Sequence, residues 1–140
     1  MNIEVLTAII GITGVLVGAV TQYIFTRATE SMKHYQELKS HAYTDFIKAF
    51  SGLAISQKNH SDDEKYKIQL TDAKVRISVY GSKQVIQSMA DFLRDYSALN
   101  SQEAMDAFTN LIQKIRGDTK KEKVPDDQIH LLLFGREQST

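Results

Sequence analysis

The chain has 140 residues, of which 42% are hydrophobic and 24% are charged, and its 17 basic side chains balance its 17 acidic ones. This composition predicts a folded domain and excludes a wholly disordered chain, and the neutral charge argues against a protein that coats DNA. The absence of cysteine fits a reducing compartment.

An uncharged run near the N-terminus, residues 5–25, reads VLTAIIGITGVLVGAVTQYIF. At about 1.5 Å per residue, a helix of this length spans roughly 30 Å, the thickness of a bilayer's hydrocarbon core. A cleaved signal peptide is an alternative, but it would need a basic start and a small-residue cleavage site. A buried core helix is another, although the three glycines and four valines of the run favour soluble helices poorly. We therefore expect a transmembrane anchor in residues 1–29.

The flanking charges predict how this span is oriented. Arg27, Lys33 and Lys39 follow the run, whereas no lysine or arginine precedes it. Positive charge is retained on the cytoplasmic side of a membrane. We therefore expect a single-pass protein whose remaining residues, 30–140, form a cytoplasmic domain.

Small residues follow one face of the expected span. Thr7, Gly11, Gly14, Gly18 and Thr21 recur at spacings of 4, 3, 4 and 3 residues. Small side chains let helices approach closely in lipid, so this face predicts a homo-oligomer. The alternative is that glycine is simply common in membrane helices.

After the span, apolar residues keep a helical period almost throughout. No proline or glycine interrupts residues 21–51, so the first helix is expected to continue out of the membrane. Residues 56–63 read as a loop. Ser61 stands three residues before Glu64, a capping-box spacing that predicts the start of a second helix. Gly81 is expected to end that helix in a left-handed conformation.

Further caps divide the rest of the chain. Ser82 predicts the start of a third helix, and Asn100 or Ser101 that of a fourth, which Gly117 should close. Pro125 suits the first position of a short last helix, which Gly135 should stop. No stretch alternates with period two, so we expect no sheet. The predicted fold is all-α: a transmembrane helix continuing into a small antiparallel bundle of about four helices plus a short C-terminal helix.

The sequence offers no enzyme motif. His34 and His41 lie seven residues apart on one expected helix, but no zinc-binding spacing surrounds them. Phosphate-binding glycine loops and a G-x-S-x-G nucleophile elbow are also missing. We expect no enzyme, no metal and no cofactor.

Two clusters of basic residues are candidates for binding an anion. The first surrounds the corner between the second and third helices and comprises Lys74, Arg76, Tyr80, Ser82 and Lys83. A capped helix N-terminus with nearby cations attracts phosphate, and a tyrosine can stack on a base. The alternative is an ordinary helix corner with its two caps.

The second basic cluster begins at Lys114 and Arg116 and continues with Lys120, Lys121 and Lys123. It could contact anionic lipid or a phosphorylated ligand. The alternatives are cations that offset a helix dipole and a solvated loop. In the last helix four apolar residues stand in a row, 131–134, more than one helix face can hide, which suggests an interface.

Arg76 followed by Tyr80, Gly81 and Ser82 resembles a corner found in a loose group of small bacterial proteins that have one N-terminal span and a short cytosolic helical domain. In plan the chain is also similar to the membrane effectors of type III CRISPR defence. In those, a cyclic oligoadenylate binds the cytosolic domain and perturbs the membrane part. The resemblance implies a location in the bacterial inner membrane and a cyclic oligonucleotide as candidate ligand.

Three functional hypotheses follow. The first is an oligomeric, membrane-anchored effector or sensor of antiviral defence or stress, whose soluble domain binds a small anionic signal and perturbs the span. The second is a passive membrane-tethered interaction module, or a small subunit of a membrane complex, without a ligand. A toxin-like protein whose soluble part regulates membrane insertion is a third.

Overall fold

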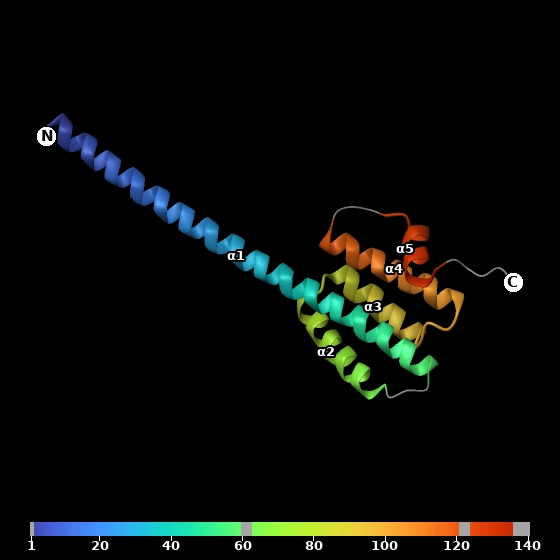
Figure 1. Ribbon diagram of the computed structural model, residues 1–140. Coiled ribbons are helices and arrows are strands. Elements are labelled where there is room, and N and C mark those ends of the chain that lie inside the picture. The colour runs from blue at the N-terminus through green and yellow to red at the C-terminus, as the bar shows by residue number, and fades with distance from the viewer. Residues whose placement is uncertain (1, 60–62, 121–123, 136–140) are drawn as a thin grey trace. The chain divides into compact units, whose positions relative to one another are not determined.

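The computed structural model describes residues 2–59, 63–120 and 124–135, and in these ranges the chain forms five helices and no strand. They are α1 (Ile3–Lys58), α2 (Glu64–Tyr80), α3 (Lys83–Asp95), α4 (Gln102–Thr119) and α5 (Asp126–Phe134) (Figure 1). The all-α prediction is confirmed. The chain divides into two units, Met1–Glu37 and Leu38–Thr140, and α1 contributes residues to both.

In the first unit, α1 leaves every described side chain exposed. Its apolar window is long and apolar enough to cross a membrane, and none of that window is buried within the protein. Exposed apolar residues such as Ile10, Val15 and Phe25 lie around the helix and not on one stripe. The described part of the chain therefore contains one candidate membrane span, and it lies near the N-terminus.

The second unit is a helical domain with a closed apolar core. The C-terminal part of α1 lies beside α2 and α3, and α1 to α4 run in alternating directions (Figure 1). Rings from three helices meet at the centre: the Phe50 ring lies 5.2 Å from that of Phe92 and 5.4 Å from that of Phe108, between centroids. Around them lie Ala42, Tyr43, Phe46, Ala49, Leu53, Leu70, Ala73, Ile77, Val85, Met89, Leu111 and Ile115.

Three predicted helix ends are confirmed. The Ser82 hydroxyl accepts a hydrogen bond from the Val85 amide at 3.4 Å, and the Ser101 hydroxyl accepts one from the Ala104 amide at 3.2 Å. Each serine satisfies a donor that the first turn of a helix would otherwise leave without a partner. Gly135 ends α5 with φ of +76°, in the left-handed region that glycine adopts at no steric cost.

Two predicted glycine roles are wrong. Gly81 ends α2 in an extended conformation, with φ −69° and ψ 151°, so no left-handed residue is needed there. The reason for glycine is space, because a Cβ at Gly81 would lie 2.6 Å from the Ile77 carbonyl oxygen. Gly117 does not close α4, which continues to Thr119.

Other boundaries shift by a few residues. α1 continues to Lys58 and buries Ser56, so the loop begins later than expected. Pro125 is the residue before α5 and not its first member. The predicted cap at Ser61 lies outside the described residues.

Candidate functional site

A largely buried polar cluster of the domain joins α1, the start of α3 and the end of α4. The Tyr43 hydroxyl donates a hydrogen bond to Asp118 Oδ2 at 2.7 Å and accepts one from the Ser82 backbone amide at 3.1 Å. Lys39 Nζ lies 3.1 Å from the same Asp118 oxygen, and both side chains are largely buried. Lys39 and Tyr43 of α1 therefore converge on the Asp118 carboxylate of α4, and Tyr43 extends this contact to the Ser82 amide.

Electrostatics keep this carboxylate charged. Burial by itself would raise the pKa of Asp118, but hydrogen bonds from Tyr43 and Lys39, and the charge of Lys39, outweigh it and hold that pKa below its usual value. Burial and the hydrogen bond to Asp118 raise the pKa of Tyr43 to about 12. The Tyr43 hydroxyl thus connects the N-terminus of α3 to an anion of the chain itself, the Asp118 carboxylate.

Arg76, predicted as a ligand residue in the first basic cluster, makes ion pairs within the domain. Its Nη2 lies 2.9 Å from Asp45 Oδ2 on α1 and 2.7 Å from Asp72 Oδ2 on α2. The hydrogen bond to Asp45 is the main reason that the pKa of Arg76 is raised. The guanidinium therefore connects α2 to α1, with two carboxylates offsetting its charge.

The other residues of that cluster have different surroundings. Lys74 and Lys83 are exposed, and Tyr80 is half-buried. The Ser82 hydroxyl accepts a hydrogen bond from the Val85 amide, and the Ser82 amide donates one to the Tyr43 hydroxyl. The contacts of Arg76 and Ser82 are explained by the fold of the domain, so they are no evidence for a ligand. A ligand shared by these residues therefore stays a prediction.

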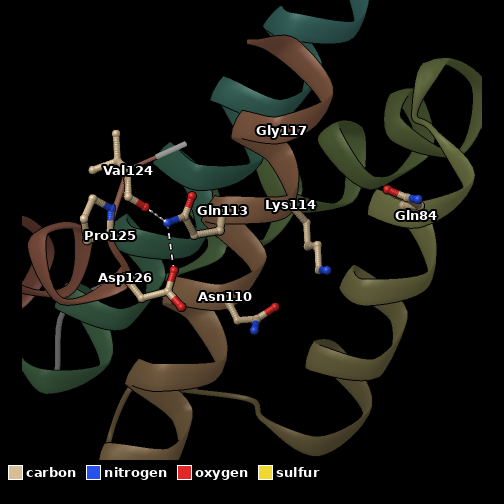
Figure 2. Close-up of a pocket in the computed structure, with 8 residues that line it drawn as sticks. All are labelled: Gln84, Asn110, Gln113, Lys114, Gly117, Val124, Pro125 and Asp126. Carbon is tan, nitrogen blue, oxygen red and sulfur yellow. Dashed lines mark hydrogen bonds between the residues drawn. The ribbon is translucent and has the colours of Figure 1, made fainter. Parts of the chain in front are cut away.

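Lys114, from the second basic cluster, lines an open cleft of about 730 Å³ between α3, α4 and the start of α5. Figure 2 shows its side chain extending from α4 toward α3, which carries Gln84. On the other side Gln113 donates hydrogen bonds to the Val124 carbonyl and to Asp126 Oδ1. The cleft is lined by Gln84, Asn110, Gln113, Lys114, Gly117, Val124, Pro125 and Asp126.

Polar side chains form part of the lining of this cleft, and its charges nearly balance. Three carboxamides can both donate and accept hydrogen bonds, and the lining contains one lysine and one aspartate. Arg116 is half-buried and is not among the lining residues. Lys120 is exposed, whereas Lys121 and Lys123 lie outside the described residues.

The small-residue stripe of the expected span is open. Thr7, Gly11, Gly14, Gly18 and Thr21 are all exposed, and a Cβ at any of the three glycines would meet nothing within 4 Å. The Thr7 hydroxyl is directed back to the Ile3 carbonyl oxygen at 2.9 Å. Association through this face stays a prediction.

Histidines and carboxylates form no metal cluster among the described residues. His34 and His41 are exposed on α1. His130 lies 3.4 Å from Asp106 and 3.1 Å from the Gln102 carboxamide, which connects α5 to α4.

No sequence motif identified Tyr43, Asp45, Asp72 and Asp118 as site residues, and Lys39 was significant only for membrane orientation. One signal was available for two of them: Lys39 and Tyr43 are four residues apart and belong to the same side of α1 as the apolar stripe. A lysine beside a buried stripe needs a partner, which suggests a carboxylate elsewhere in the chain.

No protein-family model matches the chain, and none of the curated proteins or solved structures is significantly similar to it.

Proposed function

We propose that the protein is a single-span membrane protein whose helical domain is a tethered interaction module on the cytoplasmic side of the bacterial inner membrane. The observation that carries this proposal is the apolar window of α1, in which no residue is buried by the protein. Burial of apolar surface is worth about 25 cal/mol per Å², so the window needs another apolar environment, and lipid of matching thickness supplies it.

The domain itself fits a binding module more closely than an anion-binding site. Arg76 and Lys39, two of its cations, are each held by carboxylates of the chain. By contrast, apolar side chains remain at its surface: Leu131 is 52% exposed and Leu132 is 84% exposed on α5. Such residues are typical of contacts with proteins.

Membrane attachment and orientation can be tested together, because the native chain has no cysteine. Asn2→Cys and Lys83→Cys place one thiol in each unit, at exposed positions. We expect the protein to stay in the membrane pellet after carbonate washing, with the thiol at residue 2 labelled by an impermeant maleimide in intact spheroplasts. The thiol at residue 83 should react only after lysis. Release by carbonate would refute the anchor, and the reverse labelling would refute the cytoplasmic placement.

A second candidate function is the defence or stress effector that binds a small anionic ligand, such as a cyclic oligonucleotide. The observation in its favour is the cleft in which Lys114 lies near three carboxamides. Carboxamides can pair with the polar edge of adenine, and a lysine can contact a phosphate. This effector would associate through the stripe of Thr7, Gly11, Gly14, Gly18 and Thr21 and perturb the membrane.

Ligand binding can be tested by thermal unfolding of the full chain in detergent micelles with cyclic nucleotides and cyclic oligoadenylates. A ligand at 100 times its dissociation constant adds about 2.7 kcal/mol of stability, which raises Tm by roughly 10 °C. We expect Lys114→Met to abolish such a shift and the exposed Lys48→Met to retain it. No shift with any compound would argue against the effector and favour the tethered module.

A further inference from the structure

Helix α2 carries apolar residues on two opposite faces. Leu70, Ala73 and Ile77 lie in the core, each at most 8% exposed. Ile68, Val75 and Val79 are 64%, 58% and 63% exposed. α2 lies at an edge of the domain (Figure 1), where one of its faces packs inward and the other does not.

The exposed residues form a stripe. Ile68 and Val75 are seven residues apart, the repeat of a coiled-coil seam, and Val79 follows one turn later. Thr71 and Ser78, both exposed, occupy the intervening seam positions. Single exposed apolar residues are normal on a protein surface, but three on one face over three turns make a seam for another helix.

We propose that this stripe, the α2 seam, binds the α2 seam of a second copy of the chain, with the two helices parallel. The inference rests on the proposed tethered module and names the partner of that module. The seam consists of Ile68, Thr71, Val75, Ser78 and Val79.

Flanking charges select both the partner and the direction. With Ile68 and Val75 at the first position of the heptad, Lys67 and Lys74 flank the seam on one side, and Lys65 and Asp72 on the other. In a parallel pair, Lys67 faces Asp72 of the second copy, and this happens twice by symmetry. In an antiparallel pair the lysines of the two copies face each other, which is unfavourable. The charges that flank this face therefore match those of a second copy when the two helices are parallel and not when they are antiparallel.

The flanking side chains are accessible for this contact. The Lys67 side chain is 59% exposed and lies 2.9 Å from Asp63, and the Asp72 side chain is 63% exposed beside Arg76. A carboxylate can accept several hydrogen bonds, so Asp72 can keep Arg76 while it meets a second lysine.

The small size of the seam makes the membrane necessary. Three apolar residues per copy cover much less than the ~1,000 Å² that a stable complex in solution requires. Anchoring in one bilayer raises the effective concentration of the copies and makes a weak contact sufficient. We therefore expect the contact in membranes and not between dilute chains in detergent.

Cysteine crosslinking of the full chain in native membranes tests this arrangement. Ile68→Cys and Val75→Cys each place a thiol in the seam, and Gln87→Cys places one at an exposed position of α3 as the matched control. With a mild oxidant, we expect residues 68 and 75 to crosslink to their own counterparts at least about tenfold faster than residue 87, since a disulfide needs close Cβ atoms. The product should have twice the mass of the 15.8 kDa chain. Val75→Lys, added to Ile68→Cys, should remove this advantage.

Three results would overturn the proposal. Equal rates at residues 68, 75 and 87 would show that the seam does not meet a second copy. An adduct of another mass would identify a different protein as the occupant. Faster crosslinking between Ile68→Cys and Ser78→Cys chains than between like chains would show the antiparallel arrangement. The share of protein in the carbonate-washed pellet, measured in the same samples, separates each of these results from a failure of the membrane anchor.

Discussion

The two units use the same secondary structure in different ways. In α1, residues 3–37 bury no described side chain, whereas residues 38–58 bury eight. The first segment has apolar residues on all sides, and the second has them on one stripe that includes Ala42, Phe46 and Leu53. The distribution of apolar residues around a helix therefore indicates whether its surroundings must be apolar on every side or on one side only.

The charged residues differ in the same way. The first unit has no charge over residues 5–25. In the second, Lys39 and Asp118 are paired and largely buried, while Arg76 connects α2 to α1 through two carboxylates. Charge in the helical domain thus serves its internal packing as well as its surface.

The largest effect that would test this comparison is expected from a core substitution. Phe108 is fully buried against Phe50 and Phe92. We expect Phe108→Ala to lower the free energy of unfolding by about 3–5 kcal/mol, from lost apolar burial and a cavity. Leu16→Ala, in the first unit, should change it by less than about 0.5 kcal/mol. Urea unfolding of the full chain in detergent, followed by tyrosine fluorescence, measures both. Similar losses in the two variants would contradict the division into two units.

A smaller effect is expected at alkaline pH. The pKa of Tyr43 is raised to about 12, above the ordinary value of about 10. Its contribution to stability is therefore fully present below pH 10 and is lost as pH rises through 12, a change of about 2–3 kcal/mol. We expect Tyr43→Phe to remove this part of the alkaline decline.

The matched control for that measurement lies in the first unit. Tyr23 is exposed there and hydrogen-bonds only the nearby Arg27 among the contacts that the structure records for it. The free energy of unfolding of Tyr23→Phe, measured from pH 8 to 12, should follow that of the native protein. If Tyr43→Phe also followed it, the hydrogen bond to Asp118 would not stabilise the domain.

The smallest expected changes in stability come from replacing single glycines with alanine, and they differ between positions. Gly117 lies inside α4 with nothing within 4 Å of an added Cβ, so Gly117→Ala should stabilise the domain by about 0.5–1 kcal/mol. Gly81→Ala should destabilise it, because its Cβ would meet the Ile77 carbonyl oxygen. Gly14→Ala, in the first unit, should leave the unfolding of the domain unchanged. Thermal melts in detergent compare the three. A loss of stability in Gly117→Ala would mean that this residue is needed as a helix end after all.

Local features of the fold were predictable because their causes lie within a few residues. Ser82, Ser101 and Gly135 act on the turns beside them, and the helical period of apolar residues identified the inward faces. Gly81 was assigned the wrong role because the close approach of Ile77 depends on the actual path of the backbone. Gly117 was read as a stop because glycine is disfavoured inside helices, but that penalty is only about 1 kcal/mol and α4 continues past it to Thr119.

The candidate site was predictable only in part. Lys114 was expected near a ligand and does line a cleft, but its neighbours Gln84 and Asp126 come from other elements. Arg76 was identified by its charge, yet its partner Asp45 lies 31 residues away in the sequence.

The sequence by itself determined that the protein is helical, that its first helix is long and apolar enough to cross a membrane, and where α3 and α4 begin and α2 and α5 end. These properties depend on residue types at short spacing. Only the tertiary structure decided which polar groups meet: Tyr43 and Asp118 are 75 residues apart, and Ser82 lies between them in the chain. Their meeting depends on how three helices pack, and so does the free outer face of α2. Charge and hydrogen-bonding capacity can be read from a sequence, but a partner is selected by distance in the fold.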